Sequence, residues 1–283
     1  MNPLDSDSSH RAAHRRVALI TSTPDLVLPF LSTNLGSLGI EIPVAVLIRP
    51  QATWRDRLRH LPPVLKRQAK INRTLPLLQL AYRVLYYRIA SEREHRSDRR
   101  TLSASALERL KFGREVVEAR SVNEPAVVEA LRGSECELGL VVGADVLTRR
   151  TLDEIRVPLV NLHMSDPAFV RGMPPIFWEV HDGQADLTLT LHRLTIQLDG
   201  GPVLVQSRVP IQWRESLAGT LAATRRIAVE EIAILLTESL PKILDGRLEA
   251  RNVASGPVRT IPRLRDVMQA RKVCRERASA SRG

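Results

Sequence analysis

The chain has 283 residues, of which 43% are hydrophobic, so it can form one large α/β domain or two small ones, and a wholly disordered protein is excluded. Its two cysteines, Cys136 and Cys274, are too few and too far apart for a disulfide framework, which indicates a reducing compartment, and we expect a cytoplasmic protein. No run of about 18 apolar residues and no apolar N-terminal segment occurs, so we expect neither a membrane span nor a signal peptide.

The net charge of +11 is concentrated in two stretches. Residues 51–120 hold 17 Lys and Arg against 7 Asp and Glu, and residues 251–283 hold 9 against 2, whereas residues 121–250 hold 12 against 18. A basic stretch can contact nucleic acid, a phosphorylated ligand or acidic lipid. A solvated, arginine-rich helical surface is the simpler interpretation.

The first part of the chain predicts a βαβ unit after a flexible N-terminus at residues 1–16. Residues 17–21 form a β-branched run, a turn-prone segment follows at residues 22–25, and an apolar-periodic stretch continues to about Leu38. Residues 42–48 predict a second strand. This order implies a parallel sheet with a right-handed crossover.

Residues 50–113 interrupt this pattern and lack strand alternation. Apolar residues recur at helical spacing from Leu75 to Ile89, which predicts an amphipathic helix over roughly residues 75–95. Its apolar face needs a partner, either the main sheet or a second copy of the chain, so a homodimer stays open.

The sheet resumes in the second half of the chain. We expect strands at residues 116–119, 138–142, 157–162, 187–194 and 201–211, and helices at residues 124–132 and 216–246, the latter with a break considered at Pro241. Residues 255–283, basic and poor in apolar side chains, are expected to be partly disordered. The predicted fold is α/β: a Rossmann-like, mostly parallel sheet with helices on both faces and a helical insertion.

Three residues are candidates for catalysis: Asn161 and His163 at the C-terminal end of the strand predicted at residues 157–162, and Asp199 in the turn between the last two predicted strands. Asn161 can donate a hydrogen bond to a developing oxyanion, His163 can hold and pass a proton, and Asp199 can orient the imidazole and raise its pKa. An amide, an imidazole and a carboxylate suit the movement of an acyl group between two amines. A nucleophilic triad with Ser165 is disfavoured because no Gly-x-Ser-x-Gly elbow surrounds it. His181 and His192 lack partners at metal-ligand spacing, so we expect packing or surface roles for them and no metal.

These motifs resemble those of the folate-dependent formyltransferase family, which includes methionyl-tRNA, glycinamide ribonucleotide and sugar-nucleotide formyltransferases. The family motif is Asn-x-His-Pro-Ser-Leu-Leu-Pro, then two residues and Arg-Gly; the corresponding segment here is Asn161-Leu-His163-Met-Ser165-Asp-Pro-Ala, Phe-Val and Arg171-Gly172. The second motif, Asp-x-Gly followed by an apolar strand ending in Gln, is similar to Asp199-Gly-Gly-Pro-Val-Leu-Val-Gln206. The resemblance covers residues 16–49 and about 115–250, and the loop at residues 21–25 looks like that of the methionyl-tRNA branch.

The resemblance implies transfer of a formyl group from 10-formyltetrahydrofolate to an amine, without a metal. It implies that Asn161 steadies the oxygen of the tetrahedral intermediate, that His163 stabilises its charge, and that Asp199 sets the protonation of His163 and helps relay the proton. The residues implied to bind the formyl donor are Val146, Leu147, Thr148, Ser165 and Gln197, and those implied to bind the acceptor are Thr23, Asp25 and Arg171. Residues 21–25 can also be only a helix-capping turn, and Arg171 only a loop anchor.

The chain departs from the family pattern after His163. Met164 replaces Pro, and Asp166-Pro167-Ala168 replaces Leu-Leu-Pro, so the Asp166 carboxylate can repel the folate tail or bind the amine. We expect a catalytic domain at residues 17–250 and a basic tail at residues 251–283. About 77 residues follow Gln206, which we expect to be too few for the full C-terminal barrel of the methionyl-tRNA enzymes.

The expected acceptor is therefore a small-molecule amine, such as an amino sugar, and nucleic acid or a phosphorylated ligand is considered at the basic insertion. Three alternatives stay open. One is formylation of methionyl-tRNA, and another is hydrolysis of formyltetrahydrofolate, for which residues 1–16 are expected to leave no room for a regulatory domain. The third is a non-catalytic relative that binds RNA or a protein partner.

Overall fold

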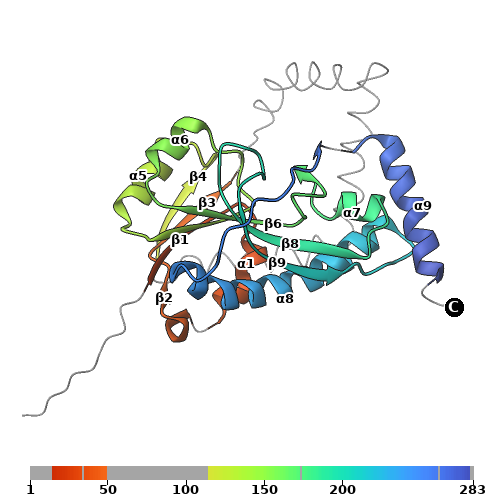
Figure 1. Ribbon diagram of the computed structural model, residues 1–283, viewed down its shortest axis with the longest axis horizontal. Coiled ribbons are helices and arrows are strands. Elements are labelled where there is room, and N and C mark those ends of the chain that lie inside the picture. Colours follow the sequence, from red (N-terminus) through yellow and green to blue (C-terminus); the bar gives the residue numbers. More distant parts are fainter. Residues whose placement is uncertain (1–14, 34, 50–113, 173, 261, 281–283) are drawn as a thin grey trace, which may run out of the picture.

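An eight-stranded sheet is the centre of the computed structural model, which describes residues 15–33, 35–49, 114–172, 174–260 and 262–280 (Figure 1). The seven strands of its main path follow one another as β4 (Glu115–Ala119), β3 (Val44–Ile48), β1 (Arg15–Thr21), β5 (Leu138–Val142), β6 (Leu159–His163), β8 (Asp186–Arg193) and β9 (Val203–Pro210). The short β2 (Ile40–Glu41) pairs with β1 off this path. Neighbours from β4 to β6 are parallel, whereas β6, β8 and β9 pair antiparallel.

This arrangement confirms the predicted α/β fold with a mostly parallel sheet. The strands expected at residues 138–142 and 187–194 correspond to β5 and β8 within one residue, and β6 begins two residues later than expected. The insertion at residues 50–113, with its predicted helix, lies outside the described residues, as do residues 1–14 of the N-terminus expected to be flexible at residues 1–16. Its last two residues, Arg15 and Arg16, instead form the start of β1.

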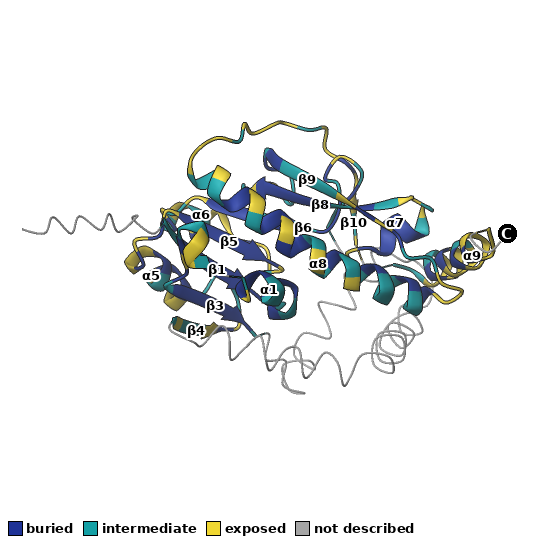
Figure 2. Cartoon of the chain, turned by 90° about the horizontal axis from the view of Figure 1, so that it is seen from below, coloured by how far each residue is buried: buried dark blue, intermediate teal, exposed yellow. Residues whose placement is uncertain are grey.

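Helices cover both faces of the sheet. The helices α1 (Pro24–Leu31) and α8 (Leu217–Leu244) lie together below the sheet in Figure 1, with the 3₁₀ turn η1 (Leu35–Leu38) after α1, and α5 (Pro125–Gly133) and α6 (Arg149–Glu154) lie on the other side. Buried and exposed residues alternate along α8, as Figure 2 shows, because one side of this helix packs on the strands.

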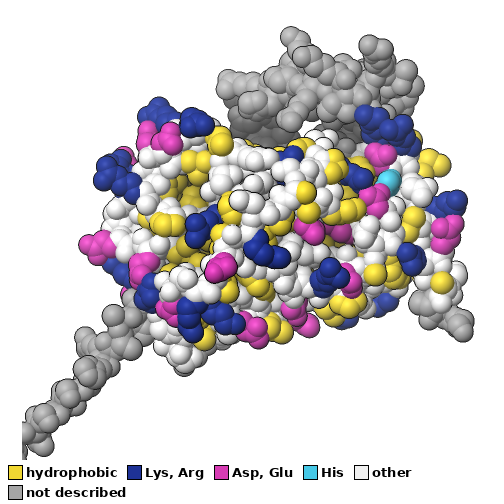
Figure 3. All heavy atoms as spheres, in the orientation of Figure 1, with side chains coloured by type: hydrophobic (Ala, Val, Ile, Leu, Met, Phe, Trp, Pro, Cys, Tyr) yellow, Lys and Arg dark blue, Asp and Glu magenta, His cyan; other side chains and the backbone are white. Residues whose placement is uncertain are grey.

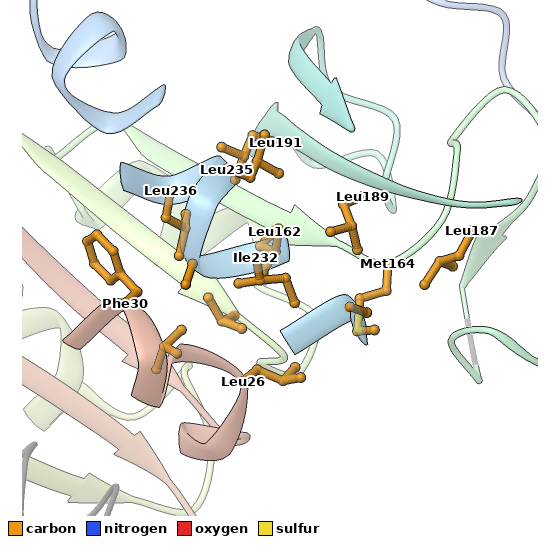
Figure 4. Packing of buried hydrophobic residues seen from close by; sticks show 14 of the residues in the cluster. Leu26, Phe30, Leu162, Met164, Leu187, Leu189, Leu191, Ile232, Leu235 and Leu236 are labelled. Atoms are coloured by element: carbon orange, nitrogen blue, oxygen red, sulfur yellow. The ribbon is translucent and has the colours of Figure 1, made fainter. Parts of the chain in front are cut away.

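The larger hydrophobic core lies between the sheet and the α1–α8 pair. Figure 4 shows its centre, in which side chains from β6 and β8 meet side chains from both helices: Leu26, Phe30, Leu162, Met164, Leu187, Leu189, Leu191, Ile232, Leu235 and Leu236. Alternation along β8 sends its odd-numbered leucines into this core and turns its even-numbered residues toward the opposite face.

Two helical expectations need correction. The helix α8 continues to Leu244 without a break. Pro241 lies in its last turn, so the single backbone hydrogen bond that this proline cannot donate is lost near the end of the helix and not in its middle. The helix α1 ends at Leu31, earlier than the periodic pattern suggested. Within the described residues, no helix has both the length and the apolar character that crossing a membrane requires.

The expectation of disorder beyond residue 255 is wrong for most of this stretch. Residues 264–280 form the helix α9 (Leu264–Ala280), which packs against α7 (Phe177–His181) and α8. Its buried side chains recur three or four residues apart, at Val267, Ala270, Cys274 and Ala278, a helical period that the high charge of the segment obscured. Just before α9, β10 (Val258–Arg259) pairs in parallel with β7 (Arg171–Gly172).

The helix α8 offers a matched pair of substitutions that tests its packing. Leu236 is fully buried, whereas Ile234, two residues earlier, is 51% exposed. We expect Leu236→Ala to lower the free energy of unfolding by about 2–5 kcal/mol, because it leaves a cavity, and Ile234→Ala to change it by about 0.5 kcal/mol or less. Chemical denaturation of the two variants measures both values, and equal losses would contradict the orientation of α8.

Candidate active site

The strand β6 presents Asn161 and His163 on the same face of the sheet. Val160 and Leu162 point into the core beneath α1 and α8, and Leu159 packs into the cluster beneath α5 and α6. Because successive side chains of a strand alternate between faces, Asn161 and His163 lie on the same side as Leu159. The strand therefore carries both polar side chains away from the larger core.

Asp199 comes from the turn between β8 and β9 and lies beside His163. The Asp199 Oδ1 atom is 3.6 Å from His163 Nδ1, and the two side chains are only 12% and 11% exposed. This separation is too long for a hydrogen bond but is short enough for an ion pair when the imidazole is protonated. The structure thus brings together the three side chains predicted to be catalytic.

Burial decides the protonation of His163. It lowers the pKa of His163 below its ordinary value, and the Asp199 carboxylate and a backbone contact with Val170 act in the opposite direction without reversing the shift. The sequence correctly predicted that Asp199 raises the pKa of His163, but it did not predict the larger lowering by burial. His163 Nε2 is buried and has no hydrogen-bond partner among the described residues, which is costly for an imidazole nitrogen.

The backbone around Asp199 is shaped to aim its carboxylate. Asp199 has a φ of 45°, a left-handed conformation that non-glycine residues adopt at some cost. Its second carboxylate oxygen accepts a hydrogen bond of 2.9 Å from the backbone N–H of Gly172. Gly172 has a φ of 99°, and a Cβ there would lie 2.4 Å from the Arg259 carbonyl oxygen. The Arg-Gly motif therefore supports Asp199 through its backbone.

Asn161 is held by a histidine to which the sequence assigned no such role. In the β6–β8 pairing Asn161 lies opposite His192, and Asn161 Nδ2 is 3.1 Å from His192 Nε2. His192 Nδ1 donates to the Arg193 carbonyl oxygen at 3.0 Å, so Nε2 is left as the acceptor for the amide. Burial lowers the pKa of His192, which favours this neutral form. The sequence signal that could have revealed this contact is the position of His192, which is an even-numbered residue of the strand that pairs with β6.

A pocket of about 440 Å³ lies on the same face as these side chains. Its walls come from α6, the start of β6 and the turn after β8, and include Arg149, Leu152, Leu159, Leu194, Thr195 and Ile196. Leu159 is two residues before Asn161, or about 7 Å along an extended strand. The volume is in the range of small-molecule sites, and the lining mixes apolar and charged groups.

The segment predicted to bind the formyl donor lies beside this pocket. Asn123 holds it: its Oδ1 atom accepts the backbone N–H of Thr148 at 2.8 Å, and its Nδ2 atom donates to the Val146 carbonyl at 2.9 Å. Val146 is 63% exposed and Leu147 is buried. Gln197 is exposed in the turn after β8 and donates to the Ser255 hydroxyl at 3.2 Å.

Ser165 and Arg171, also predicted to bind ligands, use their side chains within the protein. Ser165 is buried, and its hydroxyl donates to Glu179 of α7. The Arg171 guanidinium donates to the backbone carbonyl oxygens of Gly256 at 2.8 Å and of Leu198 at 3.4 Å, as a loop anchor does. Their roles in binding remain predictions.

The first loop, with Thr23 and Asp25, lies at the same edge of the sheet. Thr21 of β1 pairs with Val142 of β5, and Val142 pairs with Leu162 of β6, so the loop begins two strands, or about 10 Å, from the end of β6. The Thr23 hydroxyl donates to the Val142 carbonyl at 3.3 Å. Asp25 forms an ion pair of 2.5 Å with Arg225 of α8. Their contact with an acceptor remains a prediction.

On the face shown in Figure 3, acidic and basic side chains of the described residues lie next to one another. Among the described residues, no group of three or more His, Cys, Asp or Glu side chains is arranged to hold a metal ion. The Asp166 carboxylate accepts the backbone N–H of Ala168 at 2.9 Å and so closes the turn after His163.

Glu179 is a buried carboxyl group near this turn. It is 3% exposed, and burial raises its pKa from the ordinary 4.5 to about 7, with a smaller contribution from Asp182. The Ser165 hydroxyl and Arg259 act in the opposite direction. The carboxyl therefore keeps its proton over much of the acidic range in the folded protein.

Replacing Glu179 by Gln should remove a pH-dependent loss of stability. The unfolded chain releases this proton near pH 4.5 and the folded protein only near pH 7, so the free energy of unfolding falls as the pH rises between these values. The shift corresponds to roughly 3 kcal/mol. Denaturation at both pH values measures the free energy of unfolding of Glu179→Gln minus that of the wild type. This difference should increase by about this amount from the lower to the higher pH, and a constant difference would contradict the cost of burying the carboxylate.

Comparison with known proteins identifies the family. The family model described as Formyl transferase matches residues 86–237, which is more than half of the chain. The chain is 30% identical over 144 residues to the methionyl-tRNA formyltransferase of Chloroflexus aggregans and 28% identical over 138 residues to that of Parabacteroides distasonis. These matches cover 50% and 49% of the chain and 45% and 41% of the two relatives, so the chain spans less than half the length of these proteins.

Solved structures share the fold. Glycinamide ribonucleotide transformylase 1 of Symbiobacterium toebii has a TM-score of 0.56 at 18% identity, with 86% of this chain and 95% of that one covered. A sugar N-formyltransferase of Shewanella sp FDAARGOS_354 has a TM-score of 0.52 at 13% identity, with 91% and 88% covered. At these identities the likeness concerns the fold alone. The family match and the common architecture together show that the chain belongs to the formyl transferase family.

Proposed function

We propose that this protein transfers a formyl group from 10-formyltetrahydrofolate to the amine of a small-molecule acceptor. The observation that carries the proposal is the convergence of Asn161, His163 and Asp199 on one buried face of the sheet. Membership of the formyl transferase family supports the reaction type. The proposed catalytic domain comprises residues 17–250. Residues of the basic C-terminal segment pack against it, since β10 pairs with β7 and α9 packs on α7.

The residues present fit the proposed formyl donor. The pocket of about 440 Å³ combines apolar side chains, which suit an aromatic ring system, with polar groups, and it lies at the start of β6 beside Leu159, although Asn161, His163 and Asp199 do not line it. The residues proposed to hold the donor are those of the pocket, Val146 to Thr148, and the turn that contains Gln197. The donor would supply an activated formyl group there. The unpartnered His163 Nε2 gives a second reason to expect a ligand.

The protein's own groups would act in sequence. Asn161 uses one amide hydrogen on His192, and its second is free to donate to the formyl oxygen as negative charge develops there. His163, kept neutral by burial, accepts at a ring nitrogen the proton that the attacking amine loses. Asp199 then stabilises the imidazolium across 3.6 Å, and Gly172 keeps its carboxylate in place. The imidazolium would give its proton to the departing nitrogen of the donor as the bond to the formyl carbon breaks.

A second acceptor deserves the same assay. The two relatives named above are methionyl-tRNA formyltransferases, and this favours methionyl-tRNA as an alternative to a small amine such as an amino sugar. Because the chain spans less than half of their length, the relatives do not decide between the two acceptors. Each should be supplied separately with the formyl donor.

Substituting Asn161 tests the proposed function. We expect Asn161→Ala to reduce kcat by about 100- to 1000-fold, because a donor aimed at the developing oxyanion is lost. Formyl transfer from 10-formyltetrahydrofolate to a panel of amino sugars and to methionyl-tRNA gives the measurement, with Asn252→Ala, at an exposed asparagine, as the matched control.

Calorimetry with the 5-deaza analogue of the donor separates binding from chemistry. Binding by the wild type with no loss in Asn161→Ala, together with loss of transfer, supports the proposed role. Absence of donor binding and of transfer to every acceptor in the wild type would reject the proposed function.

The contact between His192 and Asn161 predicts a graded series. His192→Leu removes the acceptor for the Asn161 amide and should reduce kcat by about 10- to 100-fold through misplacement of the donor. His192→Gln places an amide oxygen near the lost Nε2 atom and should retain more activity. His181→Leu, on α7, is the matched control. Equal losses in His192→Leu and His192→Gln would mean that the acceptor itself does not matter.

A further inference from the structure

The loop at residues 164–172 joins the two members of the proposed proton-handling pair. It starts immediately after His163 and ends at Gly172, whose backbone N–H holds the Asp199 carboxylate at 2.9 Å. Val170, inside the loop, presents its backbone to the His163 ring. The position of this loop therefore sets how His163 and Asp199 face each other.

Backbone contacts anchor the loop on one side. The Thr190 hydroxyl donates to the Ser165 carbonyl oxygen at 2.8 Å, and Gln206 donates to that hydroxyl at 3.2 Å. Thr190 is the residue opposite His163 in the β6–β8 pairing. From the C-terminal segment, the Gly256 N–H donates to the Pro167 carbonyl at 2.8 Å. These contacts fix the backbone but leave the Ser165 side chain to another element.

That element is α7, which reaches the loop through Glu179. The Ser165 hydroxyl donates to Glu179 Oε1, and both residues are 3% exposed. The residue before α7, Ile176, is buried with a φ of 69°, which is strained for a β-branched side chain. The strained entry indicates that α7 is held in a particular position relative to the loop.

No ion pair offsets the burial of the Glu179 carboxyl group among the described residues. Asp182, on the same helix, pairs with Arg259 of β10 at 2.8 Å, and Arg259 lies over the Trp178 ring at 4.8 Å. Arg277 of α9, which packs on α7, donates to the Gly183 carbonyl oxygen. Among the described residues, no Lys or Arg side chain lies within ion-pair distance of Glu179. A buried carboxyl without a cation costs stability that an apolar side chain would not.

We propose that Glu179 is a positioning residue for the transfer reaction, and that it holds Ser165 so that the 164–172 loop keeps Asp199 against His163. The inference rests on the proposed function for its kinetic consequences. It assigns the cost of burying Glu179 to the geometry of the site, at which locally unfavourable groups are commonly retained.

The protonation of Glu179 gives the proposal a kinetic signature. An ionised carboxylate accepts the Ser165 hydroxyl in a charge-assisted bond, which is stronger than the bond to the neutral acid. Burial raises the pKa of Glu179 to about 7, so kcat of the wild type should rise with pH through this region. Glu179→Gln keeps an acceptor oxygen but does not ionise, and it should lack this rise.

Three variants and one matched control test the contact kinetically. Glu179→Met and Ser165→Ala remove the two sides of the bond, and each should lower kcat about tenfold or more with KM changed about twofold or less. The kcat of the double variant should be no lower than that of the less active single variant. The control is Glu231→Met, since Glu231 of α8 accepts the Ser207 hydroxyl at 2.6 Å in an equivalent contact outside the loop.

A titration of His163 by nuclear magnetic resonance tests the geometry without activity. Glu179→Met and Ser165→Ala should lower the pKa of His163 further, because Asp199 moves away from it, whereas Glu179→Gln and Glu231→Met should leave it near the wild-type value. An unchanged His163 titration in folded Glu179→Met and Ser165→Ala would overturn the proposal. So would a pH profile of Glu179→Gln identical to that of the wild type.

The two proposals fail in distinguishable ways. If the wild type transfers no formyl group but the His163 titration responds as expected, the proposed function falls, and only the structural part stands: Glu179 and Ser165 keep Asp199 against His163. If the wild type is active and both the titration and the pH profile ignore Glu179, the positioning role falls alone.

Discussion

The antiparallel pairing of β8 with β6 is the constraint on which the site depends. It places His192 opposite Asn161 and Thr190 opposite His163, so that each proposed catalytic residue of β6 has a polar neighbour on the adjacent strand. A shift of one residue would turn these neighbours into the leucine core and bring leucines to the site. The same register thus serves the core on one face of the sheet and the polar site on the other.

Burial then determines how the polar groups behave. His163 and His192 both have a lowered pKa because the sheet and its covering segments remove water from them, and the ring centroids lie 6.3 Å apart. Neutral imidazoles can accept hydrogen bonds and protons, as the proposed roles require. Asp199 opposes the effect of burial on the pKa of His163 but does not overcome it.

The C-terminal segment belongs to the structure that supports this site. Its strand β10 pairs with β7, Gly256 contacts both Pro167 and Arg171, and α9 covers α7. A Cβ on Gly256 would lie 2.7–2.8 Å from the backbone of Ala168 and Phe169, so the close approach of the two segments requires glycine. Residues distant in the sequence therefore hold the turn that follows His163.

The sequence by itself determined the mostly parallel sheet and the presence of Asn161 and His163 on one face, because strand periodicity and a two-residue spacing are local properties. Their grouping with Asp199 was predicted from the chemistry of the three side chains and from the family resemblance of the motifs. Only the tertiary structure decided that His192 binds Asn161, that Ser165 binds Glu179, and that α9 packs on α7. These contacts depend on the strand register and on the C-terminal segment, which packs back against α7. The pKa of His163 depends on the balance between its burial and the charge of Asp199, and no local sequence pattern encodes the packing that sets this balance.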